Sequence, residues 1–220
     1  MWQGDIVKDL YTIIYYTSNR EDEALETRIR QILKKMSGGI PIVSVSQKPI
    51  DFGENICVGD VGANDHNLYR QIQIACETAK TPFVLSAEAD NLYPPDYFTF
   101  ENPELGKIYR YKNIWILKYW RTFFVKKRWC EGAQIIDREY YLKLLEEELK
   151  GMPMWLNEKH PRTNPFRALG EDFPRFGDGA VISLKTGNGL RANTLTDNSQ
   201  YTRELPYWGN VKTVRRKLGI

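Results

Sequence analysis

Hydrophobic residues along the first hundred positions gather in short runs that alternate with amphipathic stretches. The runs at residues 11–16, 41–46 and 82–85 contain β-branched and aromatic side chains, which favours buried strands. In residues 21–36 and 66–80, apolar positions recur at helical spacing. This alternation predicts parallel strands joined by right-handed helical crossovers.

The second half of the chain has a different pattern. Aromatic and basic residues are interleaved throughout residues 108–130, which predicts strands or a hairpin rather than a helix. The pattern then predicts a short core strand at 131–138, a helix at 139–150, a loop-rich segment at 151–179 and a last strand at 180–184. The predicted fold class is therefore α/β, with a mixed, mainly parallel sheet flanked by helices.

Composition narrows the class of protein without naming a function. The chain has 220 residues, of which 42% are hydrophobic and 27% are charged, as in an ordinary globular protein. The net charge of +3 is too small to indicate nucleic-acid binding by itself. Three scattered cysteines, together with no basic leader and no apolar run of membrane-spanning length, predict a cytoplasmic protein of a bacterial or infected host cell.

Two carboxylates stand where the third predicted strand ends, in the sequence Glu88-Ala89-Asp90. Side chains at i and i+2 of a strand point to the same side, so both acids can converge on one point. Carboxylate oxygens are the ligands of hard divalent cations, which predicts a Mn²⁺ or Mg²⁺ site. An ordinary solvated acidic turn is the alternative interpretation of the same three residues.

Taken together, these features resemble a glycosyltransferase of the GT-A fold, closest in layout to the family-2-like group and to its compact phage and bacterial members. The polar loop at residues 17–20 is similar to the nucleotide-binding start of that fold. Tyr69-Arg70-Gln71 is similar to the family's Ala-Arg-Asn helix, and Glu88-Ala89-Asp90 takes the place of its Asp-x-Asp. The resemblance covers about residues 10–190.

The resemblance implies a UDP-sugar donor and a single domain spanning residues 1–220. About residues 1–100 would form the nucleotide-sugar-binding half, and about residues 101–220 would form the acceptor-binding half with a basic tail. The metal would be held by Glu88 and Asp90. The nucleotide-sugar contacts would come from Thr17, Ser18, Arg20, Gln47, Lys48, Arg70, Gln71 and Lys185. The alternative interpretation of each charged residue in this set is that it is a solvated surface charge without a binding role.

The resemblance also implies a catalytic base and an inverting transfer of a hexosyl group. Gly170-Glu171-Asp172 resembles the Glu-Asp pair that supplies the base in inverting members. Asp172 is the first candidate for removing the proton of the acceptor hydroxyl, and Glu171 and Asp178 are the reserves. A helix N-cap or an exposed loop acid is the alternative role for Asp172.

Two departures from the family pattern affect the predicted site. Gln47 and Lys48 stand where the family has an acidic uracil-binding residue, and no histidine lies near Lys185 to serve as a further metal ligand. The metal would then rest on Glu88, Asp90 and diphosphate oxygens, or Lys185 would replace part of the cationic stabilisation.

The resemblance implies an acceptor hydroxyl, for which a saccharide and a hydroxymethylated base in phage DNA are the two hypotheses. An anionic polymer would bind to a set of cations, Lys126, Lys127, Arg128, Arg215, Arg216 and Lys217. The alternative is that these residues form an ordinary basic surface with no binding role. Two other functions compete. A nucleotidyltransferase would use the same crevice, although residues 17–20 lack the glycine-rich loop of that class. A non-catalytic nucleic-acid-binding module would use the aromatic–basic middle without needing the acid pair.

Overall fold

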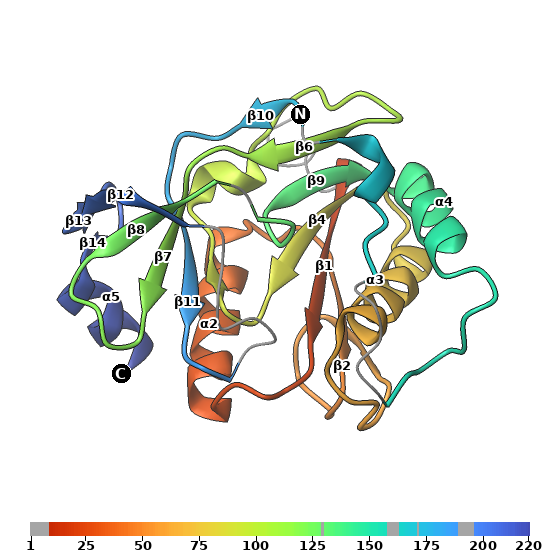
Figure 1. The fold of residues 1–220 in the computed structure, drawn as a ribbon, viewed down its shortest axis with the longest axis horizontal. Coiled ribbons are helices and arrows are strands. Elements are labelled where there is room, and N and C mark those ends of the chain that lie inside the picture. Colours follow the sequence, from red (N-terminus) through yellow and green to blue (C-terminus); the bar gives the residue numbers. More distant parts are fainter. Residues whose placement is uncertain (1–8, 129, 158–162, 171, 189–195) are drawn as a thin grey trace.

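The computed structural model describes residues 9–128, 130–157, 163–170, 172–188 and 196–220. Two main sheets and the helices around them make up this part of the chain (Figure 1). Within it, no helix is both long enough and apolar enough to cross a membrane. The three cysteines are free thiols, with Cys57 exposed and the other two buried.

The larger sheet has seven strands in the order β10-β6-β9-β4-β1-β2-β3. The bounds are β1 Tyr11–Thr17, β2 Ile42–Ser46, β3 Glu54–Cys57, β4 Phe83–Glu88, β6 Ile108–Tyr111, β9 Gln134–Asp137 and β10 Arg175–Phe176. β1 pairs in parallel with β2 and β4, and β2 pairs in parallel with β3. Only β9 runs against its neighbours, β4 and β6. The prediction of a mixed, mainly parallel sheet flanked by helices is confirmed.

Local sequence signals explain where the two crossover helices begin. The side chain of Asp22 accepts a hydrogen bond from the Leu25 amide and starts α2, Glu23–Met36. The side chain of Asn64 accepts from the Asn67 amide in the same way and starts α3, Asp65–Thr78. Both helices return the chain to a parallel strand, as the periodicity predicted.

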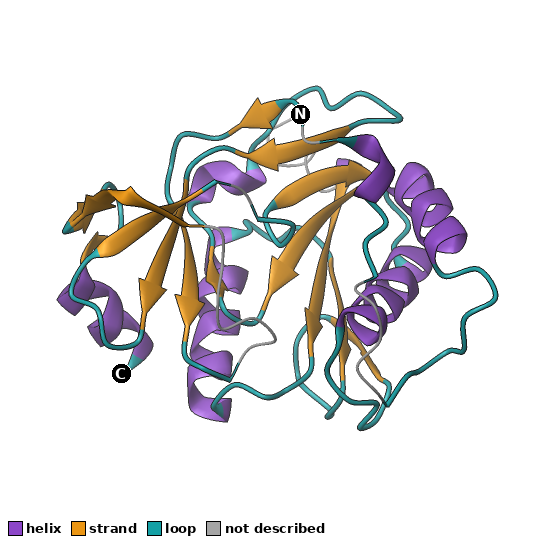
Figure 2. Ribbon diagram, viewed as in Figure 1, coloured by secondary structure: helices purple, strands orange, loops and turns teal. Residues whose placement is uncertain are grey.

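Different helices pack against the two faces of the large sheet. α3 and α4 (Arg138–Glu148) lie side by side on one face (Figure 2). There they cover the buried side chains of Ile14, Val84 and Ile136. The other face packs against α2 and the short 3₁₀ helix η1 (Pro95–Phe98). Because side chains alternate along a strand, the residues of β4 divide between these two cores.

A second sheet of five strands, β12-β8-β7-β11-β5, was not predicted as a separate unit. The bounds are β5 Asn91–Leu92, β7 Ile114–Lys118, β8 Phe124–Lys127, β11 Val181–Lys185 and β12 Thr196–Thr202. α2 lies between this sheet and the larger one (Figure 1). The strands β7 and β8 form an antiparallel pair, which confirms strands in the aromatic middle of the chain.

The predicted basic tail is a folded element. A small two-stranded sheet, β13 (Glu204–Leu205) and β14 (Gly209–Asn210), leads into the helix α5, Val211–Leu218. Val211, Val214 and Leu218 are buried, and they pack with Trp208 against the second sheet. The cations of this segment therefore lie on the outer side of a packed amphipathic helix. The predicted loop-rich segment contains only η2 (Arg167–Leu169) and β10 among its described residues.

Candidate functional site

The two acids lie at the carboxyl end of the central strand of the large sheet. β4 ends at Glu88, and Asp90 occupies the turn between β4 and β5. The backbone oxygen of Asp90 accepts a hydrogen bond from the Leu184 amide at 2.7 Å. Nζ of Lys185 donates to Oδ2 of Asp90 at 2.9 Å, and both side chains are only 16% exposed. The second sheet thus delivers a lysine directly to the acid pair.

Polar side chains of two strands, β5 and β1, contact the Glu88 carboxylate. The side-chain amide of Asn91 donates to Oε2 at 3.1 Å, and the Tyr16 hydroxyl donates to Oε1 at 3.5 Å. Burial, and next the charge of Asp90, raises the pKa of Glu88 to about 7, although Lys127 and Lys185 act in the opposite direction. Two like charges in a poorly solvated place oppose each other's ionisation, so a cation has a strong electrostatic reason to bind there.

Gly132 allows Glu88 to occupy its position. A Cβ atom added at residue 132 would lie 2.3 Å from the carboxyl carbon of Glu88, which is far inside van der Waals contact. The same loop is tied to β4 through Tyr93, whose hydroxyl accepts from the Glu88 amide at 2.9 Å and donates to the Gly132 carbonyl at 2.6 Å. Position 132 therefore requires glycine because the Glu88 carboxylate occupies the space that a side chain would need.

Glu21 is a third acid near the pair, and the sequence alone did not nominate it. Its Oε2 accepts a hydrogen bond from the Thr186 hydroxyl at 2.7 Å. Burial raises the pKa of Glu21, and the charge of Asp90 contributes in the same direction. This contact joins the loop after β1 to the loop after β11, so the carboxyl ends of β1, β4 and β11 meet at one place.

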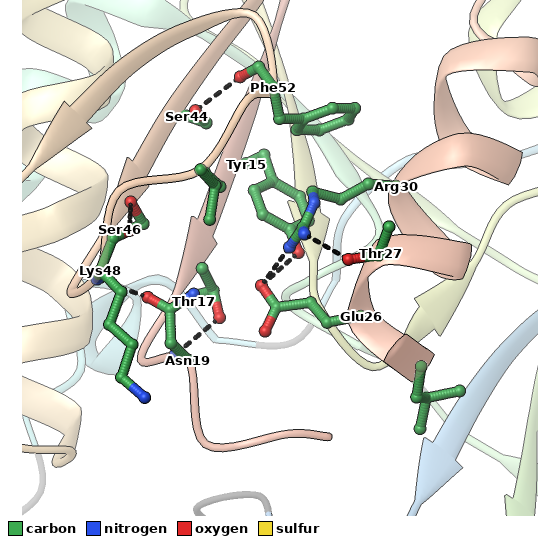
Figure 3. Close-up of polar contacts among 12 residues, drawn as sticks. Tyr15, Thr17, Asn19, Glu26, Thr27, Arg30, Ser44, Ser46, Lys48 and Phe52 are labelled. Atoms are coloured by element: carbon green, nitrogen blue, oxygen red, sulfur yellow. Dashed lines mark hydrogen bonds and ion pairs between the residues drawn. The ribbon is translucent and has the colours of Figure 1, made fainter. Parts of the chain in front are cut away.

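Asn19 organises the loops where nucleotide contacts were predicted. Its backbone has a φ of 52°, in the left-handed region that asparagine tolerates better than most residues. Its amide donates to the hydroxyl of Thr17 at 2.9 Å. Its side-chain oxygen accepts from the amides of Gln47 and Lys48, both at 2.8 Å (Figure 3). A single Asn in a polar loop gave no signal strong enough to predict this role.

Three of the predicted nucleotide contacts use their side chains to hold the protein's own backbone. The Gln71 amide donates to the carbonyls of Thr17 and Val45 at 2.9 and 3.2 Å. The Gln47 side chain donates to the Gly62 carbonyl at 2.8 Å. Arg70 donates to the Met152 carbonyl at 2.9 Å, in the loop that follows α4. These three side chains bind main-chain carbonyls of the protein, whereas Arg20 and Lys48 have exposed side chains and Ser18 is partly buried.

The described contacts do not join the predicted base residues Asp172 and Asp178 directly to the acid pair. Asp172 is exposed, and Glu171 lies outside the described residues. The Asp178 side chain is 90% exposed and pairs with Lys112 at 2.6 Å. Among the contacts of the described residues, none joins Asp172 or Asp178 to Glu88 or Asp90. Their role as the base remains a prediction.

Buried polar groups continue from Glu88 along the face of the sheet that α3 and α4 cover. Oε2 of Glu131 accepts from the Tyr69 hydroxyl at 2.9 Å, while its buried Oε1 has no hydrogen-bond partner among the described residues. The hydroxyl of Ser86 and the side-chain amide of Gln134 are fully buried and also lack partners. Such groups are commonly satisfied by ordered water. None of these three residues was predicted from the sequence as part of a site.

Contacts within the protein engage several of the predicted polymer-binding cations. Nζ of Lys126 donates to the Asn113 side chain at 2.6 Å, and burial lowers the pKa of Lys126. Arg215 donates to the carbonyl oxygens of Tyr119 and Arg121. The side chains of Arg128, Arg216 and Lys217 are exposed, and Lys127 is partly buried.

A buried ion pair on α2 contacts the strand β1. Glu26 is 2% exposed, and its Oε1 accepts from the Tyr15 hydroxyl and from Arg30, both at 2.9 Å (Figure 3). Tyr15 lies in β1 and Arg30 lies on the helix, so the contact fixes the start of α2 against the central strands. The loop at residues 18–22 is thereby held between two anchored elements.

The donor set of the acid pair fits a hard divalent cation that is shared with a ligand. Glu88 and Asp90 offer carboxylate oxygens, the donors such ions prefer, and burial of two like charges favours an added cation. Among the described residues, no cluster of three or more His, Cys, Asp or Glu side chains is arranged to hold a metal. The remaining coordination positions would therefore belong to ligand oxygens and water.

No protein-family model and no curated protein matches this sequence. Solved structures with a similar fold include a glycosyltransferase involved in glycosylation of the major capsid of PBCV-1 (10% identity, TM-score 0.40, 64% of this chain and 68% of that chain). Another is S. aureus TarS 1–349, with 12% sequence identity and a TM-score of 0.47. The match covers 80% of this chain and 60% of that chain, so this chain spans only part of that protein. A third is the inositol-1-phosphate CTP transferase from T. maritima, with 13% sequence identity, a TM-score of 0.48, and coverage of 84% of this chain and 93% of that chain. At these TM-scores the likeness assigns no activity.

Proposed function

We propose that this protein is a glycosyltransferase that moves a sugar from a nucleoside diphosphate sugar, with UDP as the nucleotide, to an acceptor hydroxyl. One observation carries the proposal. Two carboxylates and a lysine converge at the carboxyl end of the central parallel strand, where α/β sheets of this type bind nucleotides. A leaving diphosphate needs positive charge at this place, and the site offers both a lysine and a pair of cation ligands.

Glu88 and Asp90 would hold a Mn²⁺ or Mg²⁺ ion in this reaction. When bound, the ion supplies a Lewis acid that stabilises negative charge on the diphosphate oxygens. Lys185 keeps Asp90 in place and balances part of the acid charge when the ion is absent. Glu21 and Thr186 close the other side of the crevice and bring the loop carrying Ser18 and Arg20 toward the same ends of the strands.

The base and the acceptor are finer parts of the proposal. An inverting hexosyl transfer needs a carboxylate beside the acceptor hydroxyl, and Asp172 is the first candidate, with Glu171 and Asp178 in reserve. The exposed position of Asp172 suits a residue that meets an incoming acceptor. The acceptor is a hydroxyl on a saccharide or on a hydroxymethylated base of phage DNA, with the remaining basic side chains outside the crevice to receive it.

Isothermal titration with UDP and Mn²⁺ tests the proposal. We expect UDP binding that depends on the metal in the wild type and is lost in Asp90→Ala. The matched control is Glu147→Ala, because Glu147 is an exposed acid on α4 with no role in the proposed site. Wild-type protein that binds no UDP in the presence of either Mn²⁺ or Mg²⁺ would refute the assignment.

A donor screen then separates the transferase from a nucleotidyltransferase, which would use the same crevice. Slow hydrolysis of one UDP-sugar, lost in Asp90→Ala, is the expected result, because water can replace the missing acceptor. Release of pyrophosphate from CTP or UTP with a sugar phosphate, and no hydrolysis of any UDP-sugar, would assign the other class.

A further inference from the structure

The turn between β7 and β8 presents two neighbouring aromatic side chains to solvent. Tyr119 is 64% exposed and Trp120 is 69% exposed, although rings of this size are usually covered in a folded protein. Nζ of Lys118 lies 6.0 Å from the centre of the Trp120 ring. The guanidinium of Arg121 lies 4.9 Å from the ring of Phe123. The order along the chain is therefore cation, ring, ring, cation.

A third exposed ring extends this surface onto the neighbouring strand. Tyr201 of β12 is 63% exposed, and its ring lies 5.6 Å from that of Phe123. We call the surface formed by Lys118, Tyr119, Trp120, Arg121, Phe123 and Tyr201 the aromatic–basic turn.

The backbone of the aromatic–basic turn is held in place from two sides. Arg215 of α5 donates to the carbonyl oxygens of Tyr119 and Arg121, which locks the turn against that helix. The Tyr119 amide donates to the carbonyl of Lys185 at 3.0 Å. A turn held this way presents its rings at little entropic cost to an incoming ligand.

The same contacts join the turn to the acid pair. Lys118 is the register partner of Lys185, whose side chain reaches Asp90. The turn lies on the side of the molecule toward which β1, β4 and β11 point their carboxyl ends (Figure 1). A ligand lying across Trp120 can therefore extend toward the crevice.

Charge is strongly segregated around this surface. Between Glu104 and Glu131 the sequence contains eight Lys or Arg residues and no Asp or Glu. After Glu204 it contains four more cations and again no acid. Five of the first eight cations lie on or beside β7 and β8, and the four after Glu204 lie on α5, so positive charge gathers on this side of a chain whose net charge is only +3. A field of this kind attracts a polyanion.

We propose that the aromatic–basic turn binds a single-stranded nucleic-acid segment, with bases stacked on Tyr119 and Trp120 and phosphates met by Lys118 and Arg121. Exposed rings accept the faces of bases of any sequence, and flanking cations follow the backbone. A neutral glycan would use the rings and leave the cations unused. That the bound strand is also the acceptor rests on the proposed function, whereas binding itself does not.

Fluorescence anisotropy with a labelled oligo-thymidylate of about twelve nucleotides tests this surface directly. Loss of one stacked base costs about 1–3 kcal/mol, so we expect Trp120→Ala to weaken binding roughly 5- to 150-fold. Arg121→Ala should lower the slope of log affinity against log salt by about 0.7, the value for one phosphate contact on a single strand. Both side chains lie at the surface or only partly beneath it, so the variants should fold.

Two control variants separate the turn from general surface properties. Leu105→Ala removes an apolar side chain that is 73% exposed and precedes β6, and Lys35→Ala removes an exposed cation of α2. Neither should change oligonucleotide binding. Unchanged affinity in Trp120→Ala would overturn the proposal. So would equal binding of inorganic polyphosphate, or displacement of the strand by a neutral oligosaccharide.

The two proposals fail separately in this design. The affinity for UDP in Trp120→Ala should match that of the wild type, because the exposed Trp120 ring is not one of the groups proposed to bind UDP or the metal. Oligonucleotide binding that disappears in Trp120→Ala supports the turn even if no UDP-sugar is used. Metal-dependent UDP binding without any oligonucleotide binding refutes the turn and leaves the transferase intact.

Discussion

The carboxyl group of Glu88 should make the stability of this fold depend on pH. Burial and the charge of Asp90 raise its pKa from the usual 4.5 to about 7. Between these pH values the folded chain keeps a proton that the unfolded chain has released, so the free energy of unfolding falls as pH rises. At about 1.4 kcal/mol for each pKa unit, the loss is about 3 kcal/mol once the pH exceeds 7.

Glu88→Gln removes this loss, because the amide has nearly the same shape and no charge. We expect the variant to gain stability relative to the wild type as pH rises, by about 2.5 kcal/mol between pH 5 and pH 8. Urea unfolding at four pH values across this range measures the difference. Comparing two proteins at the same pH cancels the contributions of titrating groups that are distant from Glu88.

Glu147→Gln is the matched control, since Glu147 is exposed on α4. Its difference from the wild type should stay constant over the same pH range. The reasoning about Glu88 is refuted if the wild type and Glu88→Gln differ by the same amount at pH 5 and pH 8. It is also refuted if the difference changes with the opposite sign.

Two further predictions concern stability at a single pH. Gly53 and Gly38 have similar φ angles, 66° and 62°, but a Cβ at Gly53 would lie 2.3 Å from the Ile42 carbonyl oxygen, whereas Gly38 has open space. Gly38→Ala should cost about 1–2 kcal/mol from its left-handed backbone alone, and Gly53→Ala should cost at least about 2 kcal/mol more because β2 must shift. Equal losses in thermal and urea unfolding would contradict this explanation. Tyr15→Phe deletes the hydroxyl that donates to buried Glu26, and the expected loss is about 1.5–3 kcal/mol in urea unfolding. A loss below about 0.5 kcal/mol would show that Arg30 alone satisfies this carboxylate.

Much of the structure of the first hundred residues could be predicted from the sequence because its signals are local. β-branched runs, helical apolar stripes and the crossover rule predicted β1, α2, β2, α3 and β4 in order. The side-by-side placement of Glu88 and Asp90 rested on strand geometry in the same way. The aromatic middle was correctly predicted as strands, but its membership of a second sheet was not.

The remaining features depend on contacts between distant parts of the chain. Lys185 reaches Asp90 because β11 pairs with β5 immediately after the acid pair, a contact across 95 residues. Glu21 meets Thr186 across 165 residues. Neither pairing leaves a trace in local periodicity, because strand partners are selected by burial of the whole sheet rather than by residues near them in sequence.

The sequence by itself determined the order of strands and helices, and it placed two carboxylates at the end of a buried strand. These follow from side-chain periodicity and backbone preference, which act over a few residues. Only the tertiary structure decided which cation faces the acids, that Gln71 and Arg70 hold backbone carbonyls, and that the basic tail packs as α5. Those outcomes depend on which surfaces are buried together, and burial is a property of the complete fold.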